Sequence, residues 1–86
     1  MANQNRLTSL VLNTRTSANI PFDDLRGLMR DLGFAERIRG SHHIFSRAGI
    51  DEIINLQPKN GKAKVYQVRQ VRALIQHYKL GTPNDE

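Results

Sequence analysis

Two segments of the chain share one apolar spacing, and this repeat limits the folds that the sequence can adopt. In each segment the apolar residues recur at positions i, i+3, i+6, i+7 and i+10, which is the spacing of one face of an α-helix. The first set is Phe22, Leu25, Leu28, Met29 and Leu32, and the second is Val68, Val71, Leu74, Ile75 and Tyr78. We therefore expect two amphipathic helices, each of which must bury its stripe against another element.

The ends of both helices carry start and stop signals. Pro21 suits a first helical turn, where amide nitrogens have no partner within the helix, and Gly33 suits a left-handed cap after the last turn. These signals predict a helix over residues 21–32. Gly81 and Pro83 are expected to end the second helix.

Between the two helical patterns the period changes to that of strands. Three short runs, at 34–39, 42–47 and 52–57, are separated by breaks that contain glycine, which predicts an antiparallel meander. If Phe45 faces the core, alternation along the strand places His43 inward and His42 outward. The predicted fold is α+β, a helix, a three-stranded antiparallel sheet and a helix, with both helices on one face of the sheet. This order of elements resembles that of double-stranded-RNA-binding domains.

The chain has 86 residues, which suits a single domain. We expect this domain to span 20–80, preceded by an appendage over 1–19 (a short helix with Leu7, Leu10 and Val11, then a polar connector) and followed by a polar tail over 81–86. There is no Cys, no signal-peptide layout and no run long enough to span a bilayer. The expected location is cytoplasmic, with no membrane partner.

The charge of the chain is unevenly distributed. The formal net charge is +5, and residues 37–79 hold nine Lys and Arg against two acids, whereas the rest of the chain is acidic on balance. Such a basic segment favours a polyanionic partner. A solubilising surface would explain the same charge, so this feature leaves both interpretations open.

His42 follows Gly40 and Ser41 at the mouth of the first predicted hairpin. Glycine lets the backbone approach an anion closely, and serine adds a hydroxyl donor. A histidine side chain ordinarily titrates near pH 6.5, so it can move a proton during RNA cleavage while neighbouring cations stabilise the developing phosphorane charge. The arginines expected beside it are Arg37, Arg39 and Arg47. Adjacent histidines on a strand face opposite ways, so no metal site is expected, and no cofactor is implied.

The span from Phe22 to Tyr78 resembles the HicA family of toxin–antitoxin ribonucleases. The resemblance rests on the helix that ends in Leu32-Gly33-Phe34, on the run from Arg37 to Phe45, on the strand that leads into Pro58, and on the Gly-Lys loop before the last helix. It implies a fold similar to a double-stranded-RNA-binding domain, a metal-independent endoribonuclease acting on mRNA, and a HicB-like antitoxin as inhibitory partner. It also implies that His42, the histidine directly after Gly-Ser, is catalytic.

The RNA-binding residues expected around this histidine are Arg37, Arg39, Gly40, Ser41, Lys59, Lys62 and Lys64. Two other functions fit the same pattern. A non-catalytic RNA-binding module would use the basic loop 59–64 equally well. A protein that docks an acidic partner would use the basic face without any RNA affinity. The histidine after Gly-Ser separates catalysis from binding, because binding alone does not need it.

Overall fold

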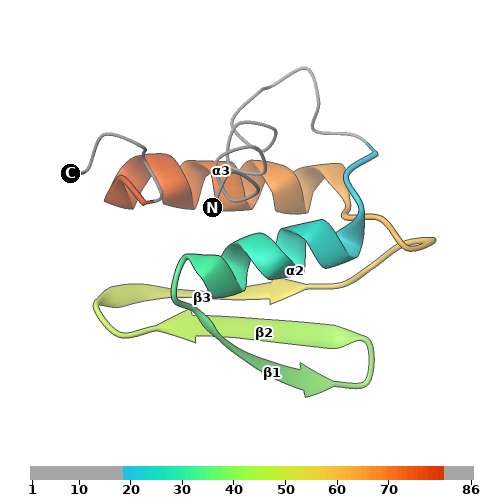
Figure 1. The fold of residues 1–86 in the computed structure, drawn as a ribbon, viewed down its shortest axis with the longest axis horizontal. Coiled ribbons are helices and arrows are strands. Elements are labelled where there is room, and N and C mark those ends of the chain that lie inside the picture. Colours follow the sequence, from blue (N-terminus) through green and yellow to red (C-terminus); the bar gives the residue numbers. More distant parts are fainter. Residues whose placement is uncertain (1–18, 81–86) are drawn as a thin grey trace.

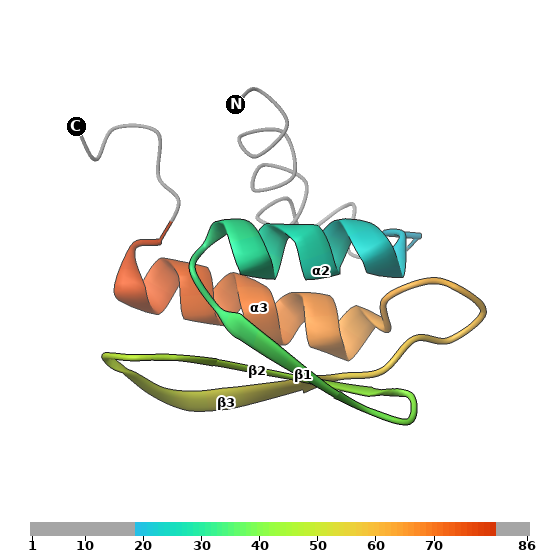
Figure 2. The same cartoon turned by 60° about the horizontal axis from the view of Figure 1, so that its bottom comes forward.

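The computed structural model describes residues 19–80. Its elements are helix α2 (Phe22–Asp31), strand β1 (Ala35–Arg39), strand β2 (His42–Arg47), strand β3 (Ile50–Leu56) and helix α3 (Val65–Tyr78). The strands form one antiparallel sheet in the order β1-β2-β3. Both helices lie on the same side of this sheet, and the opposite face carries no helix of the described residues (Figures 1 and 2). The predicted α+β order and layer arrangement are therefore confirmed. The short helix predicted in the appendage lies outside the described residues.

Most element boundaries agree with the predicted ones, but the third strand does not. It begins at Ile50, two residues before the predicted start, because the turn uses only Ala48 and Gly49. Gly49 has a φ of 88°, a conformation that glycine adopts without strain. This tight turn pairs Arg47 with Ile50, and a register shift with its extra residues on β3 separates this pair from the pairing of Phe45 with Ile54.

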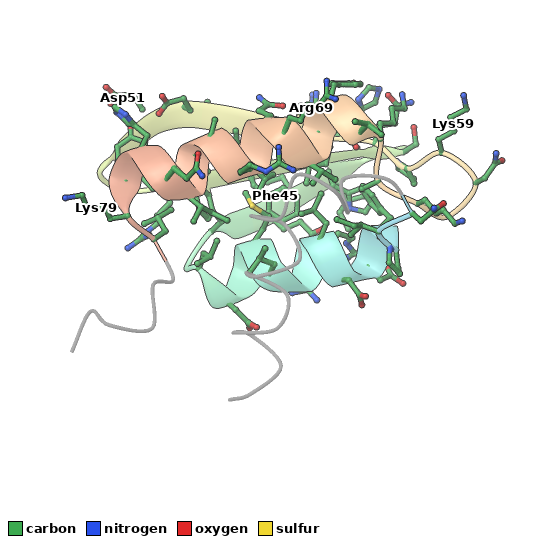
Figure 3. The ribbon with its side chains drawn as sticks, turned by 90° about the horizontal axis from the view of Figure 1, so that it is seen from above. Phe45, Asp51, Lys59, Arg69 and Lys79 are labelled. Carbon is green, nitrogen blue, oxygen red and sulfur yellow. The ribbon has the colours of Figure 1, made fainter. Side chains whose placement is uncertain are left out.

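The core lies between the helices and the inner face of the sheet. Phe45 is completely buried and lies between α2 and α3 when the molecule is seen from above (Figure 3). Its cross-strand neighbours are Glu36 on β1 and Ile54 on β3. Both apolar stripes predicted from the sequence face this core, and the other apolar contributors are Ile20, Phe34, Leu56 and Ala63. Strand alternation thus fixes which side chains of β2 face the helices and which face outward.

The segment between β3 and α3 is a structured hairpin rather than an open loop. The amide of Lys59 donates to the carbonyl of Lys62 and the reverse bond is also made, at 2.9 and 3.0 Å. Asn60 and Gly61 between them both have positive φ, as a type I′ turn requires. Backbone bonds from Phe22 to Gly61 and from Ala63 to Ile20 hold the hairpin against the start of α2.

One end of the fold gathers several of the residues singled out in the sequence. The β1–β2 turn, the end of β3 and the starts of both helices lie at the same end of the molecule (Figure 1). Lys59 lies at this end, and Asp51 lies at the opposite end (Figure 3). No helix in the described part of the chain is long and apolar enough to cross a membrane.

Candidate functional site

His42 is the first residue of β2 and lies on the open face of the sheet. It pairs with Arg39 across the hairpin, and its side chain is exposed. Its Nδ1 lies 3.3 Å from the Oδ1 of Asn55 on β3. An amide oxygen only accepts, so Nδ1–H donates to it, and Nε2 has no hydrogen-bond partner among residues 19–80. The contact leaves Nε2 as the nitrogen that can exchange a proton with a ligand.

Arg37 and Arg39 lie on the same face as His42. The register pairs Arg37 with Ile44 and Arg39 with His42, and paired residues share a face. Both arginines are exposed, and neither takes part in an ion pair with any described residue. Their charges therefore remain available to an anion that approaches this face.

Arg47 does not join this group, contrary to the expectation from the sequence. It is the last residue of β2, at the other end of the strand from His42. Its guanidinium packs over Gly33, with Nε 3.4 Å from the position that a Cβ would occupy there. Strand alternation explains this position, because Arg47 is two residues after the buried Phe45 and therefore lies on the same, helix-covered side of β2.

His43 points to the opposite side of the sheet, as strand alternation predicts. Its Nδ1 donates to Oε2 of Glu36 at 2.7 Å, and its ring meets the edge of Phe22 with centroids 4.9 Å apart. Only 12% of its side chain is exposed. His43 therefore joins β2 to α2 and β1 in the packed side of the molecule.

Glu36 is the centre of a charged network under α2. Its carboxylate also accepts from Nε of Arg26 at 2.7 Å and from Nη1 of Arg30 at 2.9 Å. The bond from Arg26, followed by those from His43 and Arg30, outweighs desolvation and lowers the pKa of Glu36 from 4.5 to about 2. The same carboxylate raises the pKa of Arg26. The network holds an ionised carboxylate between helix and sheet.

The Gly40-Ser41 turn is tied to the end of β3. Gly40 has a φ of 59° at the first central position of this two-residue turn, where glycine is favoured. Nε2 of Gln57 donates to Oγ of Ser41 at 3.2 Å. Gln57 directly precedes Pro58, so this bond links the turn beside His42 to the start of the basic hairpin.

Lys59, Lys62 and Lys64 surround one surface depression of about 850 Å³ at this end of the molecule. Its remaining lining residues are Asn19, Pro58, Asn60, Ala63 and Val65. Lys62 donates to Oδ1 of Asn19 at 3.1 Å, and no described acidic residue pairs with any of the three lysines. His42 does not line the depression. The predicted RNA-binding residues thus form two groups: the open sheet face and the lysine depression.

Sequence reasoning missed Asn55 and Gln57. Each makes its contact through cross-strand geometry, so no local motif reports it. It also missed the type I′ turn, although the Asn60-Gly61 dipeptide is a strong signal for one. Glu52 on β3 was missed as well: Tyr78 donates to it at 2.6 Å, which lowers the pKa of Glu52 and raises that of Tyr78.

Within residues 19–80, no three His, Asp or Glu side chains come together in a way that could hold a metal ion. Comparisons of the chain with family models, curated proteins and solved structures found no match. Functional conclusions therefore depend on the residues of the chain and on their geometry.

Proposed function

We propose that the protein is the toxin of a type II toxin–antitoxin system, a metal-independent endoribonuclease that cleaves mRNA with His42 as its catalytic residue. One observation carries the proposal: His42 stands exposed on the open face with Nε2 free, beside arginines that have no acidic partner. The resemblance to the HicA family over Phe22 to Tyr78 supports it, and so does the confirmed order of elements. The proposed fold family is that of double-stranded-RNA-binding domains.

The proposed reaction needs one proton transfer at the position of His42. In RNA cleavage the 2′-oxygen loses its proton and attacks the adjacent phosphorus, the bond to the 5′-oxygen breaks, and that oxygen gains a proton. Nε2 of His42 performs one of these two transfers. Arg39, directly opposite on β1, and Arg37 stabilise the additional negative charge on the phosphorane. Asn55 holds the imidazole through Nδ1 and is a positioning residue.

A HicB-like antitoxin is the proposed partner. It inhibits by covering the open sheet face around His42, since this face carries the reacting group and no described helix covers it. The face also presents Ile53, which is 65% exposed, and the half-buried Ile44. An apolar contact flanked by cations suits a partner surface that is apolar at its centre and acidic at its rim.

The experiment that tests the proposal compares purified His42→Ala with a matched histidine variant. His77→Ala is the control, because His77 is exposed on α3, away from the open face of the sheet, and its ring meets that of Tyr78. Loss of a proton-transfer group lowers the rate by about 10²- to 10⁴-fold, so His42→Ala should no longer cleave RNA or arrest growth. His77→Ala should retain both activities. A His42→Ala protein that cleaves RNA at the natural rate would refute His42 as the catalytic residue, whereas a natural chain that binds RNA without cleaving it would leave a non-catalytic RNA-binding module as the better account.

A further inference from the structure

The lysine depression is held in place by backbone hydrogen bonds, and the positive charge of its lysines is not neutralised by a described acidic residue. The hairpin that carries Lys59 and Lys62 is closed by two backbone hydrogen bonds and is joined to the start of α2 by two more. Lys64 follows after Ala63 and is the residue before α3. Three lysines thus line one hollow, and none of them pairs with an acidic residue among those described. Phosphate groups are the anions that such a surface suits.

An exposed aromatic residue stands directly beside this depression. Tyr66 lies in the first turn of α3, next to Val65, which lines the hollow. Its side chain is 60% exposed, because the buried side of α3 is formed by Gln67, Val68 and the rest of the apolar stripe. Arg69 is one helical turn further along and is also exposed. Arg69 therefore shares the exposed side of α3 with Tyr66, and Lys64 precedes Tyr66 by two residues in the chain.

The two tyrosines of the chain differ in their contacts with the rest of the domain. The hydroxyl of Tyr78 donates to Glu52 at 2.6 Å and its ring meets the edge of His77. Tyr66 makes neither kind of contact with a described residue. Packing within the domain therefore does not account for Tyr66, whereas Tyr78 joins α3 to β3.

An exposed aromatic ring next to a surface depression lined by lysines suits single-stranded nucleic acid. An unpaired base can stack on the ring while the cations neutralise the adjacent phosphates. In a duplex the bases stack on one another, so the faces of their rings are not available to a protein side chain. We propose that Tyr66 stacks on one unpaired base of a single-stranded RNA whose neighbouring phosphates occupy the lysine depression. This inference rests on the proposed function only in taking RNA as the ligand, and it specifies the substrate as unpaired.

The test uses the intrinsic fluorescence of the protein. The sequence has two tyrosines and no tryptophan, so a Tyr78→Phe variant reports on Tyr66 alone. This protein is titrated with a 2′-O-methyl single strand, which cannot be cleaved because its 2′-oxygen is blocked, and with a duplex of the same length. We expect saturable quenching of the Tyr66 emission by the single strand and none by the duplex.

Two variants in the otherwise natural chain test whether the aromatic ring of Tyr66 itself is needed for binding. Tyr66→Leu keeps an apolar side chain but removes the stacking surface, and Tyr66→Phe retains it. Tyr66→Leu should weaken single-strand binding about 5- to 100-fold, whereas Tyr66→Phe should bind as the natural chain does. Thermal melts check that both variants fold, as the exposure of the site favours.

The outcomes distinguish this inference from the proposed ribonuclease. Quenching by the single strand in a protein that never cleaves RNA would support the inference and refute the ribonuclease. Cleavage by Tyr66→Leu with an unchanged KM would refute the inference and support the ribonuclease. Equal quenching by the duplex, binding without quenching, or no binding of either RNA would each overturn the inference.

Discussion

His42 and His43 are consecutive on β2 but are held on opposite faces of the sheet by different partners. Nδ1 of His42 lies 3.3 Å from an amide oxygen of Asn55 on the open face. Nδ1 of His43 lies 2.7 Å from a carboxylate oxygen of Glu36 under α2. One histidine is thus available to a ligand, and its neighbour contributes to the packing of the fold.

This division predicts that two similar substitutions affect stability to different extents. His43→Ala removes a bond to a charged group and the ring contact with Phe22, so the free energy of unfolding should fall by about 1–3 kcal/mol. His42→Ala alters an exposed side chain and should change it by less than about 0.5 kcal/mol. Urea denaturation of both variants measures the difference. Equal losses would contradict the assignment of the two faces.

Glu36→Gln should destabilise the protein. The substitution keeps the shape of the side chain but removes the negative charge that Arg26, Arg30 and His43 share. Because the Glu36 side chain is only 9% exposed, we expect a loss of about 1–3 kcal/mol. Asp31→Asn is the matched control, since Asp31 is exposed at the end of α2, and it should have little effect. A Glu36→Gln protein as stable as the control would show that desolvation cancels the ion pairs.

The same carboxylate predicts how stability depends on pH. The pKa of Glu36 is about 2 in the folded protein against 4.5 for the free side chain, so the folded state binds fewer protons in this range. Its contribution is complete above about pH 4.5 and is lost as the pH falls toward 2. Urea midpoints measured across this range should fall more steeply for the natural chain than for Glu36→Gln. Parallel curves would mean that Glu36 titrates normally.

RNA affinity should fall as the salt concentration rises, and substitution of Lys59, but not of Lys79, should reduce this dependence. Lys59 lines the depression, whereas Lys79 lies at the opposite end of the molecule (Figure 3). Lys59→Ala should weaken binding of all RNA sequences alike and reduce the slope of log affinity against log salt by about 1. Lys79→Ala should leave the slope unchanged. The slopes come from binding titrations at several salt concentrations, and equal slopes would remove Lys59 from the interface.

The chemistry of cleavage should be visible in the products. Attack by the 2′-oxygen leaves a 2′,3′-cyclic phosphate, or a 3′-phosphate after hydrolysis, and we expect the activity to survive EDTA. End-labelling and mass spectrometry of the cleaved RNA identify the termini. Products with 5′-phosphates, or activity restored by added Mg²⁺, would indicate a metal-assisted hydrolysis instead.

Local spacing carried most of what could be predicted about the fold. The two apolar stripes predicted α2 and α3, and the glycine-containing breaks predicted three strands. Alternation from Phe45 was enough to place His42 outward and His43 inward, because successive side chains of a regular strand face opposite ways. These features depend on residues close together in the chain, so the sequence determined them by itself.

The tertiary structure decided the contacts that give the site its form. The register of β3 brought Asn55 to His42. Helix packing placed Arg30 and Arg26, six and ten residues earlier in the chain, against the carboxylate of Glu36. None of these partners follows from local periodicity, because strand register and helix packing are set by how the whole core fills the space around residues such as Phe45.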